Sequence, residues 1–170
     1  VREGRAHFDL ITPEGRSAVG LRIVGLHQVA NALAVASVAT VLGFSLDQIA
    51  SGLSTAESQA KWRMEIEELP SLVLINDAYN ASPDSTKAAL VTLAELGRQT
   101  KRPTVAVLGE MAELGQYSAE EHDAIGRLVV RLNLNQLVVV GEGAKLIHMG
   151  ASLEGSWDGE SKYFDEISDA

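Results

Sequence analysis

The feature that most constrains the fold is an alternation of short apolar runs and helix-like segments from about residue 62 onward. The runs "SLVLIN", "PTVAVLG" and "QLVVVG" are each followed by a stretch with helical periodicity. Such an alternation is typical of a parallel sheet, because each crossover helix returns the chain to the same end of the sheet. We therefore predict an α/β domain with a Rossmann-like, mostly parallel sheet and helices on both faces.

The helices of this region have predicted ends. "SPDSTKAALVTLAELG" has Ser82 as N-cap, Pro83 at the first helical position and Gly97 after the last turn. "SAEEHDAIGRLVVRL" has a capping box formed by Ser118 and Glu121. "EGAKLIHMGASL" is a further predicted helix, while "WRMEIEEL" and "KYF" are predicted strands. Because the tail "EISDA" stops where another helix is expected, we expect the domain to be truncated.

The first 60 residues have a different character. "FDLITPEGRSAVGLRIVG" predicts two strands around a Pro-Glu-Gly turn, and "SLDQIASGL" predicts a short helix with Ser45 as N-cap. Between them, "HQVANALAVASVATVLGF" is apolar on every side, which predicts a helix buried all round. We therefore predict two parts: residues 1–60 as the helical end of one domain and residues 61–170 as most of a Rossmann-like domain.

The stretch "INDAYNASPDST" places polar residues directly after a predicted strand. In parallel α/β sheets, ligands bind beyond the carboxyl ends of the strands. Asp77 can accept hydrogen bonds from both hydroxyls of a ribose, Tyr79 can stack on a base, and Asn80 can present an amide to phosphate or substrate. The alternative is that Asp77 and Asn80 cap the following helix. Since Ser82 already supplies a cap, the sequence favours a binding role.

Two further strand ends carry polar residues. Glu110 and Glu113 fall in the loop "GEMAELG" and are candidates for binding an ammonium group, and "GEGAK" follows the next strand at Gly141. The acids of the following helix are explained by its positive N-terminus. His122 is predicted to lie on the exposed start of that helix, without a special role.

Three other residues have a structural and a functional interpretation each. His27 and Asn31 are four residues apart and would face the same side of a helix, either as a satisfied buried pair or as contacts to adenine or ribose. Arg63, in the predicted strand "WRMEIEEL", is either a solvated residue or a group that neutralises charge on a transferring phosphoryl.

Composition excludes several classes. The net charge of -9 argues against a general nucleic-acid or anionic-membrane surface, and the absence of cysteine excludes disulfides and thiolate metal sites. No phosphate loop, dinucleotide fingerprint or Cys/His metal spacing occurs. The longest apolar stretch, residues 29–44, is interrupted by polar residues and is short for a membrane span. We therefore predict a cytoplasmic protein without a membrane span or a nucleic-acid partner.

Together, "GLHQVANALAVASVATVLG", "WRMEI", "INDAYNASPDSTKAAL" and "VAVLGEMAELGQYSAEEHDAIGR" resemble the Mur ligase family, in order and spacing over most of residues 19–141. Within it, they are most similar to members that join D-Ala-D-Ala to UDP-N-acetylmuramoyl-tripeptide. The resemblance implies a three-domain enzyme of peptidoglycan precursor synthesis. Residues 1–60 would be the end of its central ATPase domain, and residues 61–170 most of its C-terminal Rossmann-like domain.

The resemblance also implies the chemistry. ATP forms an acyl phosphate on the tripeptide carboxylate, and the amine of D-Ala-D-Ala attacks it, with Mg²⁺ bridging the phosphates. Arg63 matches the arginine that approaches the terminal phosphate, and Asp77 matches the acid that holds the ribose. The other residues matching the nucleotide cleft are His27, Asn31, Tyr79 and Asn80. Those matching the second motif, near the incoming dipeptide, are Glu110, Met111 and Glu113, with Asn80 as a further substrate contact.

Some features depart from the family pattern. Asn80 stands where related ligases usually carry His, Ser82 where Asn is more frequent, and Glu110 where Asp is common. The phosphate loop, the lysine-bearing metal site and the UDP-substrate domain lie outside these 170 residues, so we expect ATP and Mg²⁺ sites completed elsewhere and no ligation by this fragment alone. We expect a monomer. Two alternatives stay open: another ligase of Mur or folylpolyglutamate type, or a noncatalytic nucleotide-binding Rossmann-like module.

Overall fold

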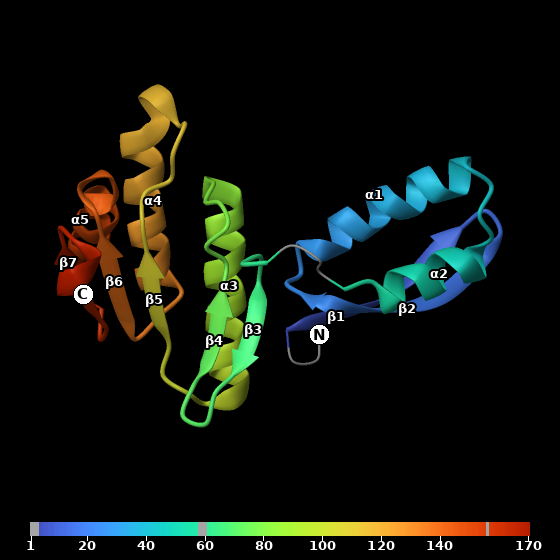
Figure 1. Cartoon of the computed structure of the whole chain (residues 1–170), viewed down its shortest axis with the longest axis horizontal. Coiled ribbons are helices and arrows are strands. Elements are labelled where there is room, and N and C mark those ends of the chain that lie inside the picture. Colours follow the sequence, from blue (N-terminus) through green and yellow to red (C-terminus); the bar gives the residue numbers. More distant parts are fainter. Residues whose placement is uncertain (1–3, 58–60, 156) are drawn as a thin grey trace. The chain divides into compact units, whose positions relative to one another are not determined.

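The structure is a computed structural model that describes residues 4–57, 61–155 and 157–170. Its helices and strands follow one another as shown in Figure 1. The chain divides into two compact units, Val1–Asn76 (unit 1) and Asp77–Ala170 (unit 2). These are units of packing, and the predicted domain boundary at residues 60 and 61 stays a prediction.

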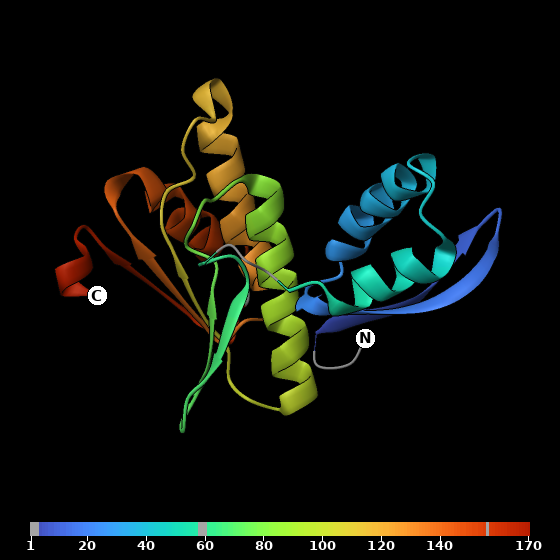
Figure 2. The ribbon, with the colours of Figure 1, turned by 45° about the vertical axis from the view of Figure 1, so that its right-hand side comes forward.

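Unit 1 begins with a hairpin covered by two helices. Strands β1 (Arg5–Thr12) and β2 (Gly15–Val24) are antiparallel, as predicted for the Pro-Glu-Gly turn. Helices α1 (Gln28–Val41) and α2 (Leu46–Thr55) lie on the same face of this hairpin (Figure 2). The buried residues between these layers form the core of the unit: Ala6, Leu10, Val19, Leu21, Ala32, Ala36, Ile49, Ala50 and Leu53.

Helix α1 is not buried all round, contrary to the prediction. Only Ala32 and Ala36 are buried, whereas Val38 is 60% and Val41 87% exposed. The hairpin and α2 cover one stripe of α1, and no described residue covers the rest. Helix α2 begins as predicted at Ser45, which forms a capping box with Gln48.

A second hairpin completes unit 1. Strands β3 (Glu65–Glu68) and β4 (Val73–Asn76) are antiparallel, with Glu65 opposite Asn76. Both fall within the predicted strands, but β3 starts at Glu65. Trp62 and Met64 have positive φ angles of 62° and 47°, so the backbone before Glu65 is not extended. Arg63 therefore precedes the strand in which it was predicted.

Unit 2 has the predicted α/β order. Its elements are α3 (Pro83–Thr100), β5 (Val105–Leu108), α4 (Ser118–Arg131), β6 (Gln136–Val140), α5 (Lys145–Leu153) and β7 (Glu160–Phe164), with short 3₁₀ turns at Gly115–Tyr117, Glu142–Ala144 and Ile167–Asp169. Strands β5, β6 and β7 pair in parallel and in sequence order. The predicted α/β class with a parallel sheet is confirmed.

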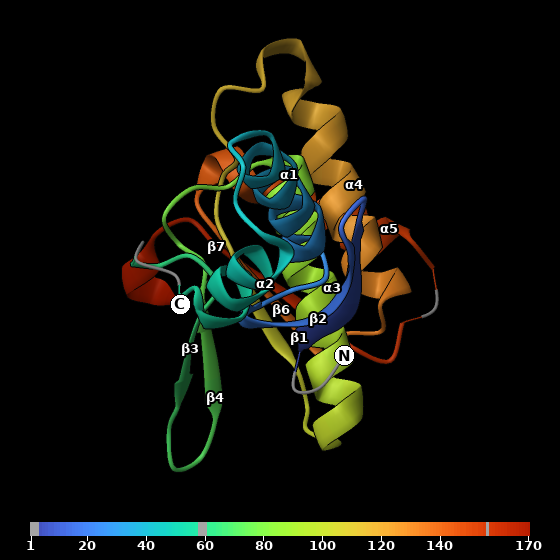
Figure 3. The same cartoon turned by 90° about the vertical axis from the view of Figure 1, so that its right-hand side faces the viewer.

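The described helices cover one face of this sheet rather than both. Helices α4 and α5 lie side by side on the same face (Figure 3). On β5, Ala106 is buried, while Val107 on the opposite face is 66% exposed. Strands added in one direction by right-handed crossovers place their helices on the same side, which explains the single layer.

Glycines allow α4 and α5 to approach closely. A side chain at Gly126 would overlap the carbonyl oxygen of Ile147, and one at Gly150 would overlap that of Asp123. The fully buried residues around this contact include Ile125, which packs in the same core as residues from β5 and β6. No helix of the described residues has the length and apolar character needed to cross a membrane.

Two predicted helix ends are wrong. Helix α3 continues past Gly97 to Thr100 and ends at Lys101, whose φ is 56°. A side chain at Gly97 would overlap the methyl group of Thr104, so the glycine allows close packing rather than stopping the helix. The predicted capping box of Ser118 is also absent, because the preceding 3₁₀ turn leads directly into α4 and gives Ser118 a helical backbone.

Candidate functional site

The polar corner after β4 is the first part of the candidate site. Asp77 follows the strand directly and is half-buried, while Tyr79 and Asn80 are exposed. The Asn80 side-chain oxygen accepts a hydrogen bond from the N–H of Ala81 at 3.0 Å. One short loop thus carries a carboxylate, a phenol and an amide at the end of a strand.

Ser82 caps α3, as predicted. Its hydroxyl accepts a hydrogen bond from the Ser85 N–H at 3.3 Å, and the Ser85 hydroxyl accepts one from the Ser82 N–H at 3.0 Å. The alternative in which Asp77 and Asn80 cap this helix is therefore wrong. A ligand-binding role for these two residues stays a prediction.

The loop Gly109–Gly115, after β5, forms the second part. Glu110 and Glu113 are exposed, and Glu113 has a positive φ of 63°. Between them, the Met111 side chain is only 1% exposed and belongs to the core of unit 2. From this position the Met111 side chain anchors the loop, and its predicted contact with substrate stays a prediction.

His122 is completely buried, whereas it was predicted on an exposed helix start. Its Nε2 atom lies 2.9 Å from the Met111 backbone nitrogen, and its Nδ1 atom lies 2.7 Å from the Ser118 carbonyl oxygen. The helical spacing contained the signal, because positions 122, 125 and 129 share one face of α4 and the latter two are apolar. Sequence reasoning missed this link between α4 and the loop Gly109–Gly115.

The loop Gly109–Gly115 also meets the chain that follows β6. A side chain at Gly143 would overlap the Glu110 carboxylate, so this carboxylate packs directly on the backbone there. The parallel pairing of β5 and β6 explains the contact, because it brings both strand ends to one edge of the sheet. Sequence reasoning noted "GEGAK" but not the contact of its Gly143 with Glu110.

The same edge continues at β7. The Tyr163 hydroxyl donates a hydrogen bond to Asp165 at 2.7 Å, which raises the pKa of Tyr163 to about 12, with burial and the charges of Asp165 and Glu142 as further causes. The phenol therefore stays protonated near neutral pH. The Lys145 ammonium lies 5.4 Å from the centre of the Tyr163 ring. Groups of both charge signs thus lie along the carboxyl edge of this sheet.

His27 and Asn31 are joined through a residue that sequence reasoning did not single out. The Gln28 amide donates to His27 Nε2 at 3.0 Å, and the Asn31 amide donates to the Gln28 side-chain oxygen at 3.0 Å. His27 and Asn31 are both exposed, so the alternative of a buried core pair is wrong. Their predicted contact with a nucleotide stays a prediction.

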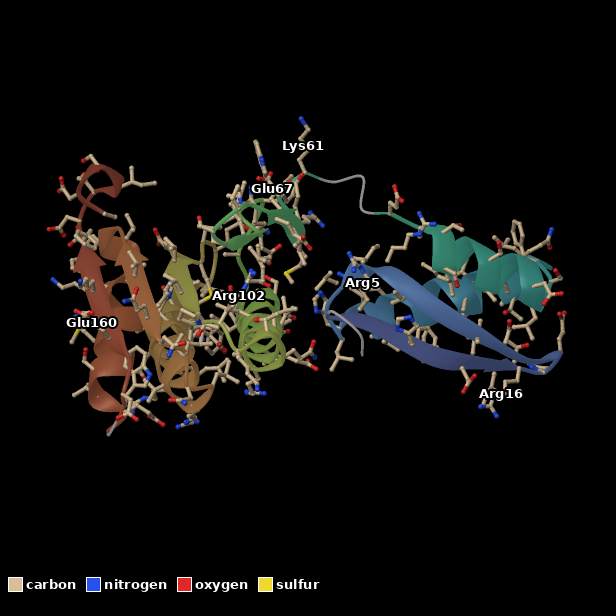
Figure 4. The ribbon with its side chains drawn as sticks, turned by 90° about the horizontal axis from the view of Figure 1, so that it is seen from below. Arg5, Arg16, Lys61, Glu67, Arg102 and Glu160 are labelled. Atoms are coloured by element: carbon tan, nitrogen blue, oxygen red, sulfur yellow. The ribbon has the colours of Figure 1, made fainter. Side chains whose placement is uncertain are left out.

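Arg63 is exposed and lines a cavity of about 510 Å³ in unit 1. Three further basic side chains line it: Arg5, Arg22 and Lys61. Arg22 is paired with Glu57 at 2.6 Å. Arg5 lies at the end of the β1–β2 hairpin opposite Arg16 (Figure 4). Glu57 and Glu65 also line the cavity, so the basic side chains outnumber the acidic ones, which favours an anionic ligand.

A metal centre is not evident in residues 4–57, 61–155 and 157–170. No group of three or more acidic or histidine side chains is arranged to hold an ion there. The predicted nucleotide residues His27, Asn31 and Arg63 belong to unit 1, and Asp77, Tyr79 and Asn80 belong to unit 2.

A family profile described as "Mur ligase, glutamate ligase domain" matches residues 62–170. Among curated proteins, the UDP-N-acetylmuramoyl-tripeptide–D-alanyl-D-alanine ligase of Mycobacterium bovis is 45% identical over 158 residues, which are 90% of this chain and 31% of that protein. The enzyme of the same name from Escherichia coli is 34% identical over 140 residues, 82% of this chain and 30% of that protein. The chain thus spans about a third of the length of these relatives.

Solved structures of MurF enzymes are also similar to this chain. A structure of MurF from Acinetobacter baumannii matches 98% of this chain and 34% of its own, with 34% identity and a TM-score of 0.84. A Thermotoga maritima MurF structure in complex with ADP covers 99% of this chain and 42% of its own, with 20% identity and a TM-score of 0.69. At that identity, the second match supports the fold alone.

Proposed function

The chain belongs to the Mur ligase family, and from that premise we propose that the complete protein is an ATP-dependent ligase joining D-Ala-D-Ala to UDP-N-acetylmuramoyl-tripeptide. The observation that carries the proposal is the 45% identity, over 90% of this chain, to a curated ligase of that name. We further propose that residues 1–60 end its central domain and residues 61–170 form most of its C-terminal domain. The matched share of the relatives, 31% and 30%, supports the proposal that this chain is one part of such an enzyme.

The proposed reaction has two steps. The terminal phosphoryl group of ATP passes to a carboxylate oxygen of the tripeptide, which releases ADP and leaves an acyl phosphate. The neutral amine of the dipeptide then attacks the acyl carbon, the bond to the phosphate oxygen breaks, and the amine loses a proton as the amide forms. The second step needs an amine held close to the acyl carbon in a site that excludes water.

The chemistry of the described side chains fits a nucleotide. Asp77 offers the carboxylate oxygens that two ribose hydroxyls require, and its half-buried position strengthens such hydrogen bonds. Arg63 offers a guanidinium fork suited to phosphate oxygens, beside other cations of the same cavity. The polar chain of His27, Gln28 and Asn31 offers further exposed hydrogen-bonding groups.

Mg²⁺ is the ion that usually accompanies nucleotide phosphates, with one or two carboxylates and the phosphates as ligands. The described residues contain no group of three acidic or histidine side chains suited to an ion. We therefore assign no Mg²⁺ ligand to these residues. The ion would neutralise phosphate charge in the first step.

The expected substrates, location and oligomeric state follow from membership of the Mur ligase family. The substrates are small molecules, and we propose a cytoplasmic, monomeric enzyme with no nucleic-acid partner. Size-exclusion chromatography with light scattering on the complete protein tests the monomer, since a dimer would double the measured mass.

The deciding experiment measures phosphate release from ATP by the complete protein with UDP-N-acetylmuramoyl-tripeptide and a panel of amines. Release that requires D-Ala-D-Ala supports the proposal. Release that requires a single amino acid assigns the protein to another ligase of the Mur or folylpolyglutamate type. No release with any acceptor argues for a noncatalytic nucleotide-binding module.

A change at Asp77 tests the nucleotide site directly. Asp77→Ala should raise the KM for ATP about tenfold, as expected for a lost pair of charge-assisted hydrogen bonds. Helix α3 should stay capped, because Ser82 and Ser85 form the cap without Asp77. Asp84→Ala, in the first turn of the same helix, is the matched control and should leave the KM for ATP unchanged. An unaltered KM for ATP in Asp77→Ala would remove Asp77 from the site.

A further inference from the structure

The buried imidazole of His122 has its protonation fixed by its neighbours. Among the described residues, it is the one buried side chain that carries an ionisable group. The Met111 N–H can only donate, so Nε2 must accept that hydrogen bond. The Ser118 carbonyl can only accept, so Nδ1 must carry the proton and donate to it. His122 is therefore held as one neutral tautomer, with both nitrogens used.

These two hydrogen bonds connect the first turn of α4 to the middle of the loop Gly109–Gly115. The Met111 side chain is buried in the same core, so the residue is fixed by its backbone and by its side chain. A loop that is held at its centre presents its flanking residues in a defined direction. Here the flanking residues are Glu110 and Glu113, both exposed.

Glu110 has a second contact. Its carboxylate packs on Gly143, where any side chain would overlap it. The loop is thus held by α4 through His122, and the Glu110 carboxylate packs beside Gly143 in the segment after β6. Both contacts lie at the carboxyl edge of the parallel sheet, where ligands of α/β folds bind.

We propose that His122 is a positioning residue for the amine substrate. By holding the Met111 backbone, it sets the place of Glu110 and Glu113, whose carboxylates receive the ammonium group of the incoming dipeptide. His122 itself does not touch the substrate. The inference rests on the proposed function for the identity of the amine, and on the described contacts for the role of His122.

Two isosteric changes separate the two hydrogen bonds. His122→Gln places an amide oxygen near the position of Nε2 and keeps an acceptor for the Met111 N–H. His122→Asn places its amide near the position of Nδ1, which keeps a donor for the Ser118 carbonyl but does not reach Met111. Ser118→Ala is the matched control on the same turn, because it removes a hydroxyl 3.3 Å from Nδ1 and keeps the carbonyl.

In the complete enzyme, His122→Asn should raise the KM for D-Ala-D-Ala about tenfold, with kcat and the KM for ATP unchanged, as expected for the loss of one buried hydrogen bond. His122→Gln should stay within about threefold of the parent protein for all three constants. Ser118→Ala should match the parent protein. Equal losses in His122→Asn and His122→Gln, or a rise in the KM for ATP alone, would overturn the positioning role.

A second measurement does not depend on catalysis. Backbone amide exchange of residues 110–113 in the complete protein should be about tenfold faster in His122→Asn than in His122→Gln. Unchanged exchange would overturn the inference even if the protein proves to be the proposed ligase. Conversely, failure to ligate any amine would refute the proposed function and leave the exchange result to decide whether His122 holds the loop.

The parent protein offers a test without any substitution, in case both variants fold poorly. Nitrogen-15 spectra of its histidines at neutral pH should show one ring with a protonated Nδ1 and an unprotonated Nε2. A protonated Nε2 on His122 would overturn the inference, because the Met111 N–H would then have no acceptor.

Discussion

Helices α1 and α4 have the same length, yet they bury their residues in different ways. Helix α4 places His122, Ile125, Gly126 and Val129 on one buried stripe and keeps its charged residues outside. Helix α1 buries Ala32 and Ala36, and exposes large apolar residues such as Val38 on its other sides. A polar face marks the side of a helix that meets water, and α1 has no such face. The buried stripe of α4 is therefore covered by its neighbours, whereas large apolar residues on α1 remain exposed.

The largest expected effect concerns the glycine contact between α4 and α5 in unit 2. Gly126→Ala should destabilise unit 2 by at least about 3 kcal/mol, because its new methyl group overlaps the backbone carbonyl of Ile147, which cannot move aside easily. Gly52→Ala in α2 is the matched control. No atom lies within 4 Å of its added carbon, so it should stabilise unit 1 by about 0.5–1 kcal/mol.

Denaturant unfolding, with amide exchange to assign each transition to a unit, measures both changes. A tolerated Gly126→Ala would mean that α4 and α5 can separate, and the contrast between a tightly covered α4 and an exposed α1 would be lost.

Truncation of one apolar side chain in each helix sharpens the comparison. Ile125→Ala should cost about 3 kcal/mol, because it leaves a cavity in a core where Ile125 is fully buried. Val38→Ala should change the stability of this chain by less than about 0.5 kcal/mol, since its side chain is mostly exposed. Urea unfolding of the two variants measures the difference. Similar losses for both would show that the outer side of α1 is covered in solution.

The helix caps should show no contrast between the units. Ser45 and Ser82 each form a capping box, one in each unit. Ser45→Ala and Ser82→Ala should each cost about 1 kcal/mol, because each removes the acceptor of an otherwise unpaired helix N–H. Thermal unfolding measures both. A much larger loss of stability at one serine would show that the two units differ in the local structure of their helix starts rather than in how their layers pack.

The smallest expected effect is a change in how the stability of the protein depends on pH in the acidic range. Hydrogen bonds and charges of Arg131 and Arg127 hold the pKa of Glu154 below its ordinary value. The stability that this pairing contributes is present above the ordinary pKa of a glutamate, about 4.5, and is lost as pH falls through the lower pKa of the folded state. Glu154→Gln should therefore reduce the fall in melting temperature below pH 4.5.

Asp9 in unit 1 provides the comparison for Glu154. Its pKa is also lowered, by the hydrogen bond to Arg16, but its side chain is 45% exposed, against 15% for Glu154. Asp9→Asn should therefore change the acid dependence less than Glu154→Gln, because solvent screens the exposed pair. Melting temperatures between pH 3 and pH 7 measure both changes. An equal change in both variants would contradict the role of burial.

Periodicity and capping residues were enough to predict most of the fold. The strands of the parallel sheet, the first hairpin and the starts of α2 and α3 all follow from local patterns in the sequence. Some of the errors lie where residues outside the local pattern shape the structure. Gly97 lies inside α3, where it leaves room for Thr104, and α1 is exposed because its partners cover only one side.

The candidate site was predictable in part for the same reason. Neighbouring residues are enough to predict Ser82 as the cap of α3. With Ser82 in that place, Asp77 is not needed as a cap. His122 was misjudged because a histidine among acids suggests a solvated turn. Its partner Met111 lies 11 residues away, on a loop whose path depends on the sheet. The overlap of Glu110 with any side chain at Gly143 likewise depends on tertiary packing.

The paired serines at the start of α3 have a consequence for how this corner can vary. Ser82 and Ser85 satisfy the helix start with each other's hydroxyls and backbone amides. The cap therefore makes no demand on the identity of residues 78–80, even though they adjoin it. Substitutions at these three positions should therefore leave the hydrogen bonds between Ser82 and Ser85 in place. Residues 79 and 80 of the proposed nucleotide site can therefore be changed while the start of α3 stays capped.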